Sequence, residues 1–303
     1  MNSLRKIAAG ALAAAMLMSV AACGSANAAG GDNAGQASDA NEEWAAATSV
    51  ADFGSFEDLE TAAKEEGALN VIALPHDWSN WGEVIETFKE KYPEIEVTEL
   101  NPNASSKEEI DAAKTNAGTD AAPDVFDTGL AVASTNTDYF APYKVQAWDK
   151  IPDELKDVGN LTQVDVTNGT IDSGQTGVVF DWTYNQASYE ASLESKGVDW
   201  EYMTFPEAQV VSYYNQSINK DAPHPAAARL WMEYLYSPEA QNLWLKGGSN
   251  PILLQSMIDE GTVDQDILAD ADVLEGDSLS YTNEDSTRIT EWLQENWDAT
   301  IGN

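Results

Sequence analysis

The chain has 303 residues, of which 52 are acidic and 15 are basic, so its formal net charge is −37. This excess of acid argues against nucleic-acid binding, which needs clustered Lys and Arg to contact phosphates. An apolar content of 43% is enough for the core of one or two domains. The single Cys rules out an internal disulfide, and two His beside one Cys argue against a zinc site, so we expect no metal and no cofactor.

The N-terminal residues have the pattern of a targeting segment. Two basic residues, Arg5 and Lys6, precede an apolar stretch, and the sequence then reads Val20-Ala21-Ala22-Cys23-Gly24. This run resembles the lipobox of a bacterial lipoprotein, in which the Cys thiol receives a lipid. We therefore expect a signal peptide over residues 1–22, lipidation of Cys23 and a flexible tether over residues 23–50. The protein would then be extracytoplasmic and lipid-anchored to the cell membrane.

The next part of the chain alternates between strand and helix patterns. Helices are expected after Ser55, around Trp81–Phe88 and over Lys107–Asn116, and strands over Leu69–Leu74, Ile95–Leu100 and Pro123–Asp127. Strands that follow one another through helices form parallel sheets with helices on both faces. Ligands of such sheets bind beyond the carboxyl ends of the strands.

Patterns in the second half of the chain predict further elements. A strand is expected over Gly177–Asp181, continuing into Trp182-Thr183-Tyr184, and another over Val210–Ile218. Two prolines open a helix at Ala226, and Ser237 caps the following helix, with Gln241 bonding back as in a capping box. A closing amphipathic helix, Arg288–Gly302, is expected to turn Trp292 and Leu293 inward.

Two stretches resemble the extracellular solute-binding proteins of ABC importers. They are LETAAKEEGALNVIAL, residues 59–74, and INKDAPHPAAARLWMEYLYSPEAQ, residues 218–241. The resemblance implies a type II periplasmic-binding-protein-like α/β fold, with two lobes built on parallel-type sheets and joined by a hinge. The ligand of such a protein is clamped between the lobes.

One part of the chain departs from the family pattern. Family members place several strands and helices between the equivalents of Pro152 and Gly159, whereas only residues 153–158 stand there in this chain. We therefore expect a solute-binding domain over residues 51–303 with a shortened second lobe. Lobe one would comprise about residues 51–140 plus the C-terminal helices, and lobe two about residues 141–245.

Aromatic and acidic residues gather at the predicted strand ends. Carboxylates beside aromatic rings suit an ammonium group through ion pairing and cation–π attraction, which favours a cationic or nitrogenous solute such as a polyamine. The candidate ligand-binding residues are His76, Asp77, Trp78, Trp81, Asp127, Thr128, Asp181, Trp182, Tyr184, Ser212, Tyr213 and Tyr214.

Three other site chemistries deserve comparison. Iron-binding relatives use a His after the first strand and an adjacent Tyr pair; His76 fits the first, but Tyr213-Tyr214 comes one strand too late. An anionic ligand could use the helix N-terminus at Ser79–Gly82, although no Arg marks that position. No His is placed for a Ser-His-Asp or Cys-His arrangement, so we do not expect an enzyme.

The resemblance implies a function as well as a fold. The protein would be the substrate-binding component of an ABC importer, a monomer that closes around a small solute and delivers it to a membrane permease with its ATPase subunit. Because the middle of the chain is short, the alternative is a truncated or repurposed surface-anchored binding or sensor protein without transport activity.

Overall fold

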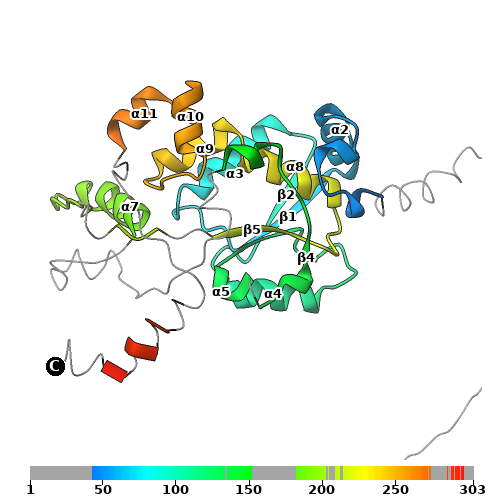
Figure 1. Cartoon of the computed structure of the whole chain (residues 1–303), viewed down its shortest axis with the longest axis horizontal. Coiled ribbons are helices and arrows are strands. Elements are labelled where there is room, and N and C mark those ends of the chain that lie inside the picture. Colours follow the sequence, from blue (N-terminus) through cyan, green and yellow to red (C-terminus); the bar gives the residue numbers. More distant parts are fainter. Residues whose placement is uncertain are drawn as a thin grey trace, which may run out of the picture.

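The computed structural model describes residues 43–133, 135–151, 182–202, 204, 209–211, 214–271 and 273, with isolated residues between 285 and 296. Helices and short strands alternate along these residues (Figure 1). The strands are β1 Ala68–Ile72, β2 Glu96–Leu100, β3 Val125–Thr128, β4 Phe140–Ala141 and β5 Asn215–Asn219. The α-helices are α2 Phe56–Glu66, α3 Trp81–Lys91, α4 Ser106–Thr115, α5 Leu130–Ala133, α7 Thr183–Glu194, α8 Pro225–Leu235, α9 Pro238–Lys246, α10 Leu254–Glu260 and α11 Gln265–Asp270.

Local signals place the helix ends as expected. The hydroxyl of Ser55 accepts a hydrogen bond from the Asp58 amide at the start of α2, and Gly67 ends this helix in the left-handed region, with φ of 70°. Helix α8 begins at Pro225, and the Ser237 hydroxyl accepts from the Ala240 amide at the start of α9. These three predicted helix starts are confirmed.

The described strands form one parallel pair and one antiparallel sheet of three strands. Strand β1 pairs in parallel with β2, as predicted. Strand β3 does not continue this sheet, because it pairs antiparallel with β5, and β4 pairs antiparallel with the other edge of β5. The beginning of β3 is held by Asn219, whose amide donates to the Asp124 carbonyl at 2.8 Å. The predicted all-parallel sheet is therefore wrong at β3: its ladder partner is the returning strand β5.

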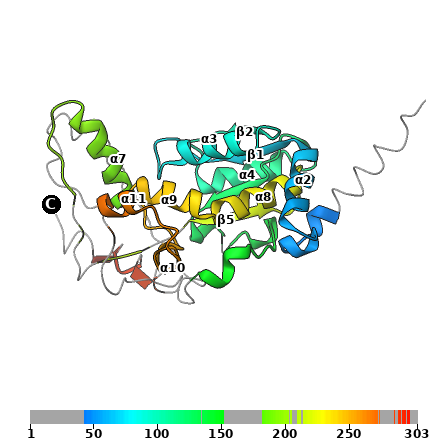
Figure 2. The ribbon, with the colours of Figure 1, turned by 90° about the horizontal axis from the view of Figure 1, so that it is seen from above.

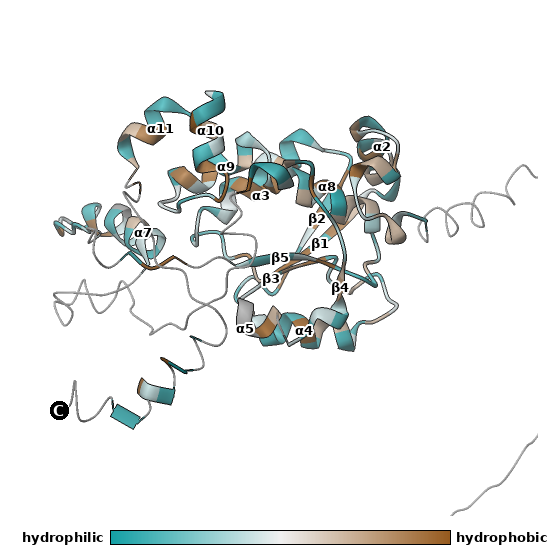
Figure 3. Cartoon of the chain, viewed as in Figure 1, coloured by the Kyte–Doolittle hydropathy of each residue, from teal (hydrophilic) through white to brown (hydrophobic). Residues whose placement is uncertain are grey.

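Helices cover both faces of β3. Successive side chains of a strand point to opposite faces, and accordingly Val125 joins the core around α8 whereas Phe126 packs with Ala113 of α4. In Figure 1, β5 lies between α4 on one side and α3 and α8 on the other. Helix α8 is buried along its whole length, and Figure 3 shows hydrophobic residues gathered in this interior.

Three local predictions are corrected by the structure. The residues after Trp182 begin helix α7 rather than continue a strand. Gln241 forms no capping box; its amide donates to the Leu235 carbonyl and its side-chain oxygen accepts from the Leu253 amide, because the side chain fills the buried junction between helices. In the C-terminal segment, Trp292 and Leu293 are exposed rather than turned inward.

The main apolar core contains residues from both of the expected lobes. Residues of β5, α8 and α9 share the main apolar core with α2, β1 and α3, although the sequence assigned them to lobe two. Helix α7 lies at the opposite end of the molecule from α2 in both views (Figures 1 and 2). The division into lobes stays a prediction. Among the described residues, no helix is long and apolar enough to cross a membrane, while the expected signal peptide, Cys23 and most of the tether lie outside them.

Candidate functional site

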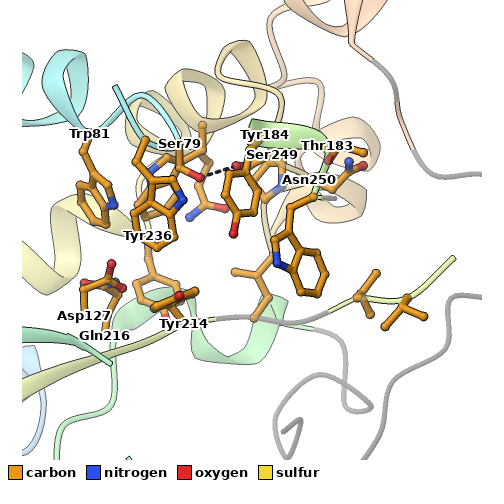
Figure 4. Close-up of a pocket in the computed structure, with 18 residues that line it drawn as sticks. Ser79, Trp81, Asp127, Thr183, Tyr184, Tyr214, Gln216, Tyr236, Ser249 and Asn250 are labelled. Carbon is orange, nitrogen blue, oxygen red and sulfur yellow. Dashed lines mark hydrogen bonds between the residues drawn. The ribbon is translucent and has the colours of Figure 1, made fainter. Parts of the chain in front are cut away.

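A cavity of about 200 Å³ opens at the carboxyl ends of β1 and β3, beside the start of β5. It is bounded by the loop after β1, the first turn of α7, and the segments that flank α9 (Figure 4). The lining residues are Trp78, Ser79, Trp81, Asp127, Trp182, Thr183, Tyr184, Val210, Val211, Tyr214, Gln216, Tyr236, Gln241, Trp244, Ser249, Asn250, Pro251 and Ile252.

Aromatic rings from three separate segments contact one another along the cavity. The ring of Trp78 meets Tyr214 edge-on with centroids 4.7 Å apart, and meets Tyr184 edge-on at 5.6 Å. Trp182 stacks on Tyr184 at 6.4 Å. Deeper in the fold, Trp81 is buried and meets Trp244 edge-on at 5.4 Å. The aromatic wall therefore depends on α7, the β1 loop and the chain before β5 lying together.

Backbone turns and close contacts position the β1 loop. Ser79 and Asn80 both have positive φ, 47° and 61°, and the Asn80 amide group donates to the Leu243 carbonyl at 2.9 Å. The Ser79 hydroxyl lies 2.9 Å from the Ser249 hydroxyl (Figure 4). The backbone of Gly247 lies so close that a Cβ there would be 2.6 Å from the Asn80 Cβ. The end of α9 and the segment that follows it therefore fix the position of the β1 loop through these contacts.

The same segment also holds α7. The Thr183 hydroxyl donates to the Gly248 carbonyl at 3.1 Å. Gly248 has φ of 80°, and a Cβ added to it would lie 2.5 Å from the Ala187 Cβ and 3.4 Å from the Tyr184 Cα. Residues 247–249 therefore contact both the β1 loop and the start of α7, which carry the rings on two sides of the cavity.

One carboxyl group reaches the cavity from β3. Asp127 is 3% exposed; its Oδ1 accepts a hydrogen bond from the Gln216 amide, and its Oδ2 has no hydrogen-bond partner among the described residues. Burial raises the pKa of Asp127 to about 8, against the lowering effect of the Gln216 bond. Figure 4 shows Asp127 and Gln216 together at one end of the cavity.

A second buried carboxyl lies behind the first. Glu109 of α4 is fully buried; its Oε2 accepts from the Asp127 amide at 2.8 Å, and its Oε1 has no partner in the part of the chain that the structure describes. Burial, with the neighbouring Asp127 carboxyl, raises the pKa of Glu109 to about 9. The raised pKa values favour the protonated form of both carboxyls at neutral pH.

Six of the predicted site residues line this cavity: Trp78, Trp81, Asp127, Trp182, Tyr184 and Tyr214. Three others do not. The ring of His76 is about half exposed and lies 2.5 Å from a Glu99 carboxylate oxygen, Asp77 is exposed, and Thr128 is buried in the β3–β5 ladder. Asp181, Ser212 and Tyr213 lie outside the described residues.

Sequence reasoning missed the remaining lining residues. Gln216 could have been found, because it lies two positions after Tyr214, and alternate residues of a strand share a face. The side chains from residues 236–252 belong to helices and their connections rather than to strand ends. Their approach to the cavity depends on how α9 packs against α3, which no local pattern indicates.

The lining residues bear on the other ligand classes. No Lys, Arg or His is among those described around the cavity, and the described residues contain no group of three metal-binding side chains. At the suggested anion site, the Gly82 amide already donates to the His76 carbonyl at 3.1 Å. The described lining of the cavity therefore offers aromatic faces, neutral polar groups and one carboxyl.

One protein-family model matches part of the chain. The model of the family described as bacterial extracellular solute-binding protein matches residues 133–242. The resemblance to extracellular solute-binding proteins is confirmed. The matched part of the chain contains α7, β5 and α8, and with them Trp182, Tyr184 and Tyr214 of the cavity. The match supports a solute-binding role in transport; the polyamine or iron branch stays a prediction. No curated protein matches the sequence.

Proposed function

We propose that this protein is the solute-capture component of an ABC importer, and that it binds a small cationic or nitrogenous solute in the cavity beside β1, β3 and β5. The observation that carries the proposal is the unpartnered Oδ2 of Asp127 in an aromatic cavity without a basic lining residue among those described. Since an ammonium group can pair with a carboxylate and lie against aromatic faces, this lining suits it better than it suits an anion.

The mechanism is closure around the solute rather than covalent chemistry. Rings of the cavity come from the β1 loop, the start of α7 and the chain before β5, so a bound cation would touch all three segments at once. A ligand that contacts both sides of a cleft favours the closed form by its differential affinity for it. The closed, liganded form would then dock on a permease, whose ATPase partner supplies the energy of transport.

The predicted lipid anchor completes the proposal. A lipid on Cys23 and a tether up to about residue 50 would keep the binding domain close to the membrane that holds the permease. Such a tether raises the local concentration of the domain near its partner without adding a contact.

Solute binding is tested by thermal unfolding of the purified protein with diamines, betaines, aminophosphonates, ferric citrate and short oligosaccharides. A solute that binds the folded state alone raises the midpoint. We expect the amines to do so, and Trp182→Ala to weaken binding about tenfold, which corresponds to the loss of one cation–π contact. Trp292→Ala removes an exposed Trp outside the cavity and is the matched control. Equal effects of both substitutions would contradict this placement of the site.

Transport is tested separately in cells. Deletion of the gene should abolish high-affinity uptake of the solute identified by unfolding, and expression of the wild-type protein should restore it. If the protein binds its solute but uptake is unchanged by the deletion, the surface-anchored binding or sensor alternative holds in place of the importer role.

A further inference from the structure

The end of the cavity formed by β3 holds a carboxyl whose hydrogen bonding is incomplete. Asp127 is 3% exposed, and its one carboxyl oxygen with a partner among the described residues is Oδ1, which accepts from the Gln216 amide. Asp127 lines the cavity, and its buried Oδ2 has no hydrogen-bond partner among the described residues. A buried carboxyl oxygen that lacks a partner is unfavourable, and a ligand group that donates to it after the carboxyl has ionised removes this cost.

Among the described residues, no positively charged group lines the cavity around this carboxyl. Among the described residues, three titratable groups lie close enough here to interact electrostatically: Glu109 on α4, Asp127 on β3 and the phenol of Tyr214 ahead of β5. All three are neutral when protonated. Since the described lining supplies no positive charge, we assign the charge that balances an ionised Asp127 to the ligand.

We infer that Oδ2 of Asp127 is the anchor of a single ammonium group that carries N–H bonds; this inference rests on the cationic solute proposed above. The ligand enters in exchange for one proton of the Glu109–Asp127 pair. The exchange is balanced: the protonated carboxyl of Asp127 gives its proton to the solvent, and the resulting carboxylate pairs with the ammonium. Glu109 keeps its proton throughout and acts as a positioning residue through its bond with the Asp127 amide.

Two consequences distinguish this anchor from general attraction to an aromatic cavity. A quaternary ammonium has the same charge but no N–H bond, so it leaves Oδ2 without a donor. Ligand binding also competes with protonation, because burial raises the pKa of Asp127 to about 8. An amine whose own pKa is near 10 stays charged over this range, so its affinity should rise about 50-fold from pH 6 to pH 8 and then level off.

The experiment is isothermal titration calorimetry of the full protein with 1,4-diaminobutane and with its hexamethyl bis-quaternary analogue. Titrations at pH 7 in two buffers with different ionisation enthalpies give the number of protons released. We expect release of about one proton with the diamine, and at least tenfold weaker binding of the analogue. Asp127→Asn should abolish both binding and proton release, whereas Asp77→Asn, the same change at an exposed residue that does not line the cavity, should preserve both. Thermal unfolding of each variant verifies that it folds.

The outcomes separate this inference from the function on which it rests. Diamine binding without proton release, equal affinity for the quaternary analogue, or equal losses in the two variants would each overturn the anchor while leaving a cation-binding protein. If neither amine binds between pH 6 and pH 9 while an oligosaccharide or another neutral solute does, the anchor and the cationic class both fail, and solute binding itself stands.

Discussion

Replacement of Gly248 by Ala tests how the segment after α9 positions the aromatic wall. With φ of 80°, Gly248 occupies a left-handed conformation that costs a residue with a Cβ about 1–2 kcal/mol. The added Cβ would also lie 2.5 Å from the Ala187 Cβ, and such overpacking costs about 1–3 kcal/mol. The free energy of unfolding should therefore fall by roughly 2–5 kcal/mol.

Gly261→Ala provides a matched control for this substitution. Gly261 also has a positive φ, 70°, but a Cβ there meets nothing within 4 Å, so only the backbone cost of about 1–2 kcal/mol applies. The difference between the two variants, measured by chemical unfolding, isolates the contact with α7. Gly248→Ala should also weaken diamine binding about tenfold, since relief of the clash moves Tyr184 and its neighbours. If both variants lose equal stability and Gly248→Ala retains full affinity, the segment does not position α7.

Two further predictions concern stability. The folding free energy should become more favourable as the pH falls from about 8 to 5, because burial raises the pKa values of Glu66, Glu109 and Asp127 to about 7, 9 and 8. Between the unfolded and folded pKa values of each carboxyl, the folded chain holds a proton that the unfolded chain releases. The free energy of unfolding therefore falls by about 1.4 kcal/mol for each pH unit of increase in this range. Greater stability at pH 8 than at pH 5 in urea titrations would refute this. Glu66→Ala should cost about 1–3 kcal/mol, because the Glu66 carboxylate accepts hydrogen bonds from two amides at the start of α8. Glu65→Ala, at an exposed position of α2, should change stability by less than about 0.5 kcal/mol, and equal losses would contradict the capping role.

The sequence by itself determined the elements that depend on near neighbours. Ser55 with Gly67 bounds α2, Pro225 opens α8 and Ser237 caps α9, because capping bonds and fixed backbone angles act within a few residues. The sequence also indicated part of the cavity. Side chains that follow parallel strands meet at one edge of a sheet, and Trp78 and Asp127 were expected there for that reason.

Tertiary structure alone decided the pairing of β3 and the rest of the cavity wall. A strand with apolar residues on both faces can pair with either neighbour. Strand β3 pairs with β5, some ninety positions away in the chain, and the bond from the Asn219 amide to the Asp124 carbonyl lies at the start of this pairing. The same long-range packing places Ser249 and its neighbours against the β1 loop. It also buries Glu109 behind Asp127, where the loss of water, which acts through space rather than along the chain, raises the pKa of both carboxyls.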